Sequence, residues 1–210
     1  MKLKKITKNR KYFKREIESQ IQELSNRMSV SHPHEGSLEP KLYFMTVTFT
    51  ESALITCPKK RLEYVRNTHE KFFMRLMGKA VKRYKKPKNR YRQPVSIDFY
   101  DFPGTKKGLG NTLKLPHTHS VLLIHPETIE RFEEARSRDF DVHQDAELRS
   151  KIQSVDFQEI DTRDDLRNVV DYSSKFFRSP APPYNDEHLH SLLYTCLGGE
   201  QASGEKFEQV

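Results

Sequence analysis

Two histidines separated by one residue are the clearest chemical feature of the sequence. His117 and His119 stand in the segment 113–124, which is rich in β-branched and aliphatic residues and is predicted to form a strand. Side chains alternate between the two faces of a strand, so both imidazoles project from the same face. Two neutral imidazoles placed in this way are suited to bind one divalent metal ion. The alternative is that they are ordinary polar residues on a half-exposed strand.

A carboxylate is expected beside these imidazoles. In the preceding predicted strand, 95–102, the residues Ile97, Phe99 and Asp101 share one face. Antiparallel pairing of the two strands in a hairpin sets Asp101 next to the histidines. Asp98 lies on the opposite face and is the weaker candidate, although a bulge would exchange the two. A site of two histidines and one carboxylate leaves positions open on Mg²⁺ or Mn²⁺, which favours a catalytic use over a structural one.

A tyrosine and a lysine supply a possible nucleophile and its helper. Tyr172 and Lys175 lie one turn apart in a predicted helix, 163–178, which Thr162 and Asp165 are expected to start with a capping box. A tyrosine hydroxyl has a pKa near 10, so it needs a nearby cation and a polarised electrophile to act as a nucleophile at neutral pH. Lys175 and a bound metal ion would provide both. The alternative is that the pair is only part of a helix surface.

Two other histidine pairs are weaker metal-binding candidates. His188 and His190 lie in a predicted short helix near 186–196, where residues two apart point about 200° from each other. His32 and His34 lie in a predicted linker, where no neighbouring element holds them rigidly.

The charge of the chain is unevenly distributed. The net charge is +8, but residues 1–92 hold 24 Lys and Arg against 8 Asp and Glu, while residues 93–210 hold 13 against 21. The strong positive charge of residues 1–92 indicates a polyanionic partner such as nucleic acid. Residues 1–15 contain eight Lys and Arg and no acid. They are read either as a basic arm leading into an amphipathic helix or as a solvated tail.

The most basic stretch is residues 79–92, which contain two tyrosines and no acidic residue. Cations neutralise phosphates and tyrosines stack on bases or sugars, so we expect contact with nucleic acid. The alternative is a solvated helix terminus. Thr46 and Thr48 are also expected to contact nucleic acid. The basic residues concerned are Lys79, Lys82, Arg83, Lys85, Lys86, Lys88, Arg90 and Arg92.

Three ordered motifs together resemble the HUH endonucleases, and within them the rolling-circle replication initiators. The motifs are residues 44–48 (Phe-Met-Thr-Val-Thr), 117–119 (His-Thr-His) and 172–175 (Tyr-Ser-Ser-Lys), and the resemblance covers about 41–178. It implies a central antiparallel sheet with flanking helices and a divalent metal on the histidine pair. It also implies that Tyr172 attacks a single-stranded DNA phosphodiester with the help of Lys175, leaving a 5′-phosphotyrosine link and a free 3′-hydroxyl. Phe176 stands where some relatives carry a second tyrosine, so one nucleophile is expected.

The resemblance also implies partners and a biological role. The expected substrate is single-stranded DNA at an origin hairpin or element end, with unwinding by a separate host helicase, at the start of rolling-circle replication of a plasmid or virus. One alternative is a single-tyrosine transposase of the same superfamily. Another is a non-catalytic, basic nucleic-acid-binding protein, whose binding would depend on salt but not on Mn²⁺.

The expected fold is α+β, with a central antiparallel sheet of about five strands and helices on its faces. Strands are also expected at 42–50 and 152–160, and helices after Pro58 and over 126–137. Two cysteines without C-x-x-C spacing indicate neither a disulfide framework nor a thiolate zinc site. No apolar run approaches membrane-spanning length, so we expect an intracellular, cytoplasmic protein. The expected organisation is a basic arm and amphipathic helix with a linker at 31–37 (1–40), the nuclease-like domain (41–180), and a short helix with a polar tail (181–210).

Overall fold

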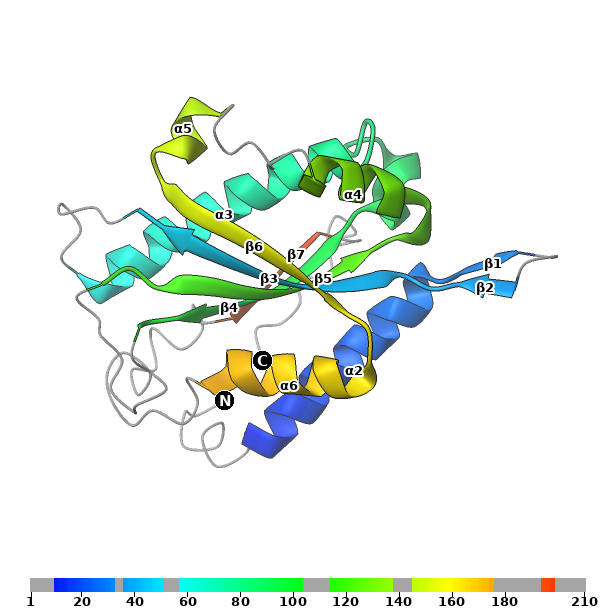
Figure 1. The fold of residues 1–210 in the computed structure, drawn as a ribbon, viewed down its shortest axis with the longest axis horizontal. Coiled ribbons are helices and arrows are strands. Elements are labelled where there is room, and N and C mark those ends of the chain that lie inside the picture. The colour runs from blue at the N-terminus through cyan, green and yellow to red at the C-terminus, as the bar shows by residue number, and fades with distance from the viewer. Residues whose placement is uncertain are drawn as a thin grey trace.

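An antiparallel sheet forms the middle of the fold. The computed structural model describes residues 10–32, 36–50, 57–103, 114–137, 145–175 and 194–198. Strands β6 (Ile152–Ile160), β3 (Lys41–Phe49), β5 (His117–Ile124) and β4 (Val95–Asp101) lie side by side in that order, and β7 (Tyr194–Gly198) pairs with the far edge of β4. Every neighbouring pair is antiparallel. Helices flank the sheet (Figure 1), so the predicted α+β class with an antiparallel sheet is confirmed.

Residue alternation explains how β3 sits in the sheet. Met45, Val47 and Phe49 are buried on one face, whereas Phe44 and Thr46 on the other face are only partly buried. β4 and β5 are buried at nearly every position, because they lie in the middle of the sheet with helices over both faces. One face of β3 therefore stays accessible, close to the start of β5.

Helices α3 (Pro58–Ala80) and α4 (Ile129–Ser137) cover one face. Pro58 suits the first turn of α3, because its fixed φ and missing N–H cost nothing there. Phe72 and Phe73 are fully buried, and each contributes about 1.5–3 kcal/mol of burial free energy. A single turn, η3 (Pro126–Thr128), leads from β5 into α4. The predicted apolar stripe of α3 is confirmed at Leu62, Val65, Phe72, Phe73, Leu76 and Ala80.

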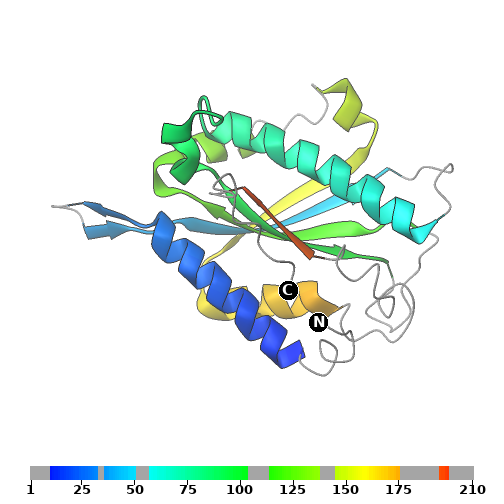
Figure 2. The same ribbon diagram turned by 180° about the vertical axis from the view of Figure 1, so that it is seen from behind.

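Helices α2 (Arg10–Met28) and α6 (Arg163–Ser173) lie on the opposite face, as Figure 2 shows from behind. The amphipathic helix predicted in the N-terminal region is confirmed: Ile17 and Ile21 are each 1% exposed and belong to the common core. Lys14 of α2 forms an ion pair with Asp171 of α6. The first helix therefore packs on the helix that carries Tyr172, and residues 1–9 lie outside the described residues.

Two segments differ from the sequence-based expectations. Most of the predicted linker belongs to two short antiparallel strands, β1 (Val30–His32) and β2 (Gly36–Leu38), because their backbone groups pair with each other, which the local composition does not indicate. Residues 194–196, predicted to end a short helix, belong to β7. The edge of β4 offers them backbone hydrogen-bond partners, and this tertiary pairing overrides the helical spacing. The remainder of that predicted helix, 186–193, lies outside the described residues.

The remaining elements are short. The basic stretch after α3 continues into a 3-10 helix, η1 (Pro87–Arg92), and one turn of helix, α5 (Ala146–Arg149), precedes β6. The helix predicted over 163–178 ends at Ser173, and residues 176–178 lie outside the described residues. None of the helices in the described part of the chain combines the length and apolar character needed to cross a bilayer.

Candidate metal and tyrosine site

The pairing of β4 with β5 brings the predicted metal ligands together. Asp101 lies directly opposite His117 in the antiparallel register. Residues directly opposite each other share a face of the sheet, so Asp101 joins both imidazoles, as predicted from the hairpin. Asp98 lies on the other face, where its Oδ1 is 3.0 Å from Nε2 of His69. The weaker carboxylate candidate is therefore outside the site.

Asp101, His117 and His119 form a compact set of ligands. One ligand atom from each residue lies within 4.8 Å of the others, which is a spacing that could hold a metal ion. The Nε2 atom of His117 is 3.6 Å from Oδ2 of Asp101. The two imidazole rings are 4.5 Å apart between centroids and nearly perpendicular, at 85°. Asp101 and His119 are buried while His117 is partly exposed, so the set is open toward solvent on one side.

The surroundings of His119 leave one of its ring nitrogens available to a metal ion. Its Nε2 atom is buried and has no hydrogen-bond partner within the described ranges. A buried polar atom left in this way costs about 1–3 kcal/mol, so a partner at this position is favoured. Its Nδ1 atom lies 3.2 Å from the hydroxyl of Thr46. With the proton on Nδ1 and donated to Thr46, the lone pair of Nε2 is available for a metal ion.

Burial lowers the pKa of both histidines. The pKa of His119 falls to about 2, chiefly because burial disfavours the charged imidazolium, with further lowering by His117 and Lys175. The pKa of His117 is also lowered by burial; Asp101 opposes this shift and Lys175 adds to it. Both imidazoles are consequently neutral at pH 7, which is the form that binds metals.

Residues Thr162 and Asp165 fix the start of α6. The hydroxyl of Thr162 accepts a hydrogen bond from the Asp165 backbone N–H at 3.0 Å, and the Asp165 carboxylate accepts one from the Thr162 N–H at 3.2 Å. This confirms the predicted capping box, which supplies partners for two backbone donors at the start of the helix. The last turn of α6 carries Tyr172.

Tyr172 and Lys175 lie beside the histidine pair. The ring of Tyr172 contacts that of His119, with centroids 5.0 Å apart and planes at 67°. The Nζ atom of Lys175 stands 4.0 Å from the centroid of the tyrosine ring, which is within cation–π range. Tyr172 is 45% exposed, so the phenol remains accessible. The structure thus places the predicted nucleophile and its helper next to the predicted metal ligands.

Lys175 connects the two halves of the site. Its Nζ atom lies 2.8 Å from Oδ2 of Asp101, while also contacting the ring of Tyr172. Asp101 therefore serves both a lysine and a histidine. Any cation bound by the three ligands would share this carboxylate with Lys175 or displace the lysine from it.

Comparisons with protein-family models, with curated proteins and with solved structures found no match for this chain. Its function is therefore inferred from the geometry and chemistry of its own residues.

The predicted phosphate-binding stretch lies elsewhere. Residues 79–92 comprise the end of α3 and the segment after it, on the face opposite α6, and pack beside the segment that follows β5. Arg92 Nε is 2.6 Å from Oε2 of Glu127, which lies just beyond the end of β5. His117 begins β5, so at 3.3 Å per residue the two ends of this strand are about 25 Å apart. The structure does not bring the basic stretch to the histidines.

The two threonines of the first motif lie on the accessible face of β3. Thr46 contacts His119, and the hydroxyl of Thr48 is 2.6 Å from that of Ser154 in β6. Phe44, from the same motif, stacks on His119 with centroids 5.4 Å apart. Sequence reasoning missed the contacts of Thr46 and Phe44 with His119. β3 and β5 are not consecutive strands, so no local connection fixes the register of one against the other. The only available signal was the alternation that puts Phe44 and Thr46 on one face.

Proposed function

We propose that this chain is a metal-dependent endonuclease and strand transferase of the HUH type, which nicks single-stranded DNA through Tyr172. One observation carries the proposal: the ring of Tyr172 lies 5.0 Å from that of His119, beside a buried set of three metal-ligand side chains. The three sequence motifs meet at this one place although they come from three different elements. A tyrosine, a lysine and a two-histidine, one-carboxylate set are together the parts that such a phosphoryl transfer needs.

Asp101, His117 and His119 are the proposed ligands. Two imidazole nitrogens and one carboxylate oxygen suit a divalent ion, which we propose to be Mg²⁺ or Mn²⁺. When bound, such an ion supplies positive charge that polarises the scissile phosphate. The partly exposed side of the set, at His117, is where a phosphate would enter.

Tyr172 is the proposed nucleophile. Its phenolic oxygen attacks phosphorus, forming the O–P bond of a 5′-phosphotyrosine while the bond from phosphorus to the 3′-oxygen breaks. The phenolic proton passes to solvent, which reaches this 45% exposed side chain, and the departing 3′-oxygen takes up a proton from water. The Nζ atom of Lys175, 4.0 Å from the centroid of the tyrosine ring, supplies positive charge beside the reacting groups. Attack of another 3′-hydroxyl on the same linkage reverses these steps and joins strands.

The test is formation of a covalent adduct. The protein is incubated with labelled single-stranded DNA of random sequence and Mn²⁺, and the label is followed on a denaturing protein gel. We expect an adduct that requires Mn²⁺ and disappears in Tyr172→Phe, while metal-free DNA binding persists. Tyr91→Phe is the matched control, since Tyr91 is 48% exposed but lies at the other end of the sheet, and it should form the adduct normally.

Two results would reject the proposal. An adduct retained in Tyr172→Phe would show that another residue is the nucleophile. Salt-dependent binding with no adduct under any metal condition would instead assign the chain to the non-catalytic nucleic-acid-binding class.

We propose initiation of rolling-circle replication as the biological role, with single-stranded DNA at an origin as the substrate and a separate helicase for unwinding. The same chemistry serves transposition, which is distinguished by joining of element ends rather than nicking at an origin.

A further inference from the structure

Five exposed cations gather at the turn between α3 and η1, away from the metal and tyrosine site. We call them the cation turn. In the part of the chain that the structure describes, no carboxylate lies within ion-pair distance of any of them, whereas nearby Arg92 is paired with Glu127. Like charges brought together without acidic partners repel one another, which favours an anionic partner. The five residues are Lys82, Arg83, Lys85, Lys86 and Lys88.

The backbone of the cation turn is held in one conformation. The side-chain amide of Asn89 donates hydrogen bonds to the carbonyls of Lys82 and Arg83, at 2.9 and 3.1 Å. The Lys86 N–H donates to the Arg83 carbonyl at 2.9 Å. Arg83 has a φ of 56°, a left-handed conformation that costs a non-glycine residue about 1 kcal/mol or more. The surroundings therefore impose this turn, and the charges project from a defined scaffold.

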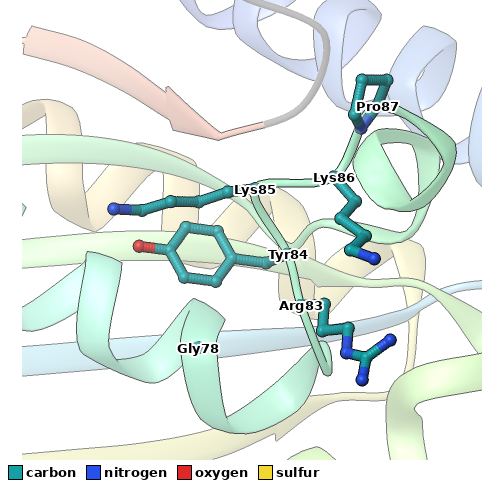
Figure 3. A pocket seen from close by; sticks show the side chains of 6 residues that line it. All are labelled: Gly78, Arg83, Tyr84, Lys85, Lys86 and Pro87. Carbon is teal, nitrogen blue, oxygen red and sulfur yellow. The ribbon is translucent and has the colours of Figure 1, made fainter.

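The cation turn borders a hollow of about 500 Å³ against the end of α3. Figure 3 shows Lys85 extending alongside the ring of Tyr84, while Arg83 and Lys86 extend in a different direction. The Nζ atom of Lys85 is 5.8 Å from the centroid of that ring. The lining is basic, with no acidic residue in it. It consists of Gly78, Arg83, Tyr84, Lys85, Lys86 and Pro87.

We propose that the cation turn binds the phosphate backbone of duplex DNA, as a second DNA contact separate from the cleavage site. This inference rests on the proposed function for the choice of DNA as the polyanion. The two regions lie at opposite ends of β5, about 25 Å apart along the strand. The cation turn therefore holds DNA flanking the strand that Tyr172 attacks.

The tyrosines beside the cation turn favour duplex over single-stranded DNA. Proteins that hold single strands offer open aromatic faces on which bases stack. Here Lys85 lies over the ring of Tyr84, and the ring of Tyr91 is engaged by Arg92 and His125. Cations whose neighbouring rings are already engaged by other side chains contact phosphates, which is the mode that duplex DNA permits without unpairing.

The test compares two DNA probes in EDTA, so that cleavage does not enter the measurement. One is a short single strand, and the other is the same strand joined to a duplex arm of roughly fifteen base pairs, about 50 Å at 3.4 Å per base pair. The variant is Lys85→Gln/Lys86→Gln/Lys88→Gln. We expect it to weaken binding of the armed probe at least about tenfold at 0.1 M salt and to reduce the salt slope by about 3, with the short probe little affected.

A second triple variant controls for net charge. Lys59→Gln/Lys71→Gln/Lys151→Gln removes the same charge from lysines that are paired with acids elsewhere on the surface. It should bind the armed probe like the wild type. Equal weakening by both variants, equal weakening on both probes, or no weakening by the first variant would each overturn the proposal. If the covalent-adduct assay showed no Tyr172 adduct, the proposed nuclease function would be rejected, whereas the result of this binding experiment would still stand.

Discussion

Two aspartates on β4, Asp98 and Asp101, lie on opposite faces of the strand and have different roles. Asp101 and Asp98 are both fully buried. Asp101 faces the histidine pair and Lys175, whereas Asp98 faces α3 and bonds to His69. Residue type and burial are the same, so only the face of the strand separates the proposed metal ligand from a structural group.

Substituting each aspartate by its neutral isostere should separate these roles. We expect Asp101→Asn to lower Mn²⁺ affinity at least about tenfold, since a charged oxygen ligand is lost. Asp98→Asn should leave Mn²⁺ affinity unchanged but lower the free energy of unfolding by about 2 kcal/mol, because a buried charge-assisted hydrogen bond is weakened. Calorimetric titration and urea unfolding measure the two effects. An equal loss of Mn²⁺ affinity in both variants would contradict the assignment of faces.

The hydroxyl of Thr46 is expected to orient His119. In Thr46→Val the side chain keeps its shape but no longer accepts a hydrogen bond from the Nδ1–H of His119, so His119 is free to rotate or change tautomer. We expect Mn²⁺ affinity to fall about 10- to 100-fold, as for other partners of metal-binding histidines. Thr46→Ser keeps the hydroxyl and should stay close to the wild type in the same titration. Identical Mn²⁺ affinities for the Val and Ser variants would show that the hydroxyl of Thr46 does not orient His119.

At the scale of elements, the sequence predicted those features that depend on residues close to one another in the chain. The bounds of β6, the buried stripe of α3 and the capping box at Thr162 depend on propensity, periodicity and side chains close in sequence. The metal set was predictable for the same reason. β4 and β5 are consecutive along the sheet-forming part of the chain and pair antiparallel, so the facing pattern of their side chains was enough to place Asp101 beside His117.

Features that depend on distant pairing escaped prediction. β7 forms on the edge of β4, a partner about a hundred residues earlier in the chain, and nothing within Tyr194–Gly198 indicates that edge. His69 occupies a position on the apolar stripe of α3, between Val65 and Phe72, but only the packed structure identifies Asp98 as its partner. The position of the cation turn, remote from the histidines, likewise follows from the direction of α3 across the sheet rather than from composition.

At the scale of the whole molecule, the site ties together elements that are distant in sequence. The ligands come from β4 and β5, Thr46 from β3, and Tyr172 from α6, which in turn packs on α2 through Lys14 and Asp171. A ligand that binds the folded chain but not the unfolded one stabilises the fold by mass action. Metal binding at this site should therefore be visible in the unfolding of the entire protein.

We expect Mn²⁺ to raise the thermal unfolding midpoint of the wild type. At 100 times its dissociation constant the ion adds about 2.7 kcal/mol, which for a chain of this size corresponds to roughly 5–10 °C. His117→Gln should lose most of this shift, and because His117 is only partly buried, the variant should remain folded without metal. Differential scanning calorimetry with and without the ion measures the shift. A shift of full size in His117→Gln would mean that the ion binds elsewhere, and none in the wild type would mean that these three side chains do not hold a metal.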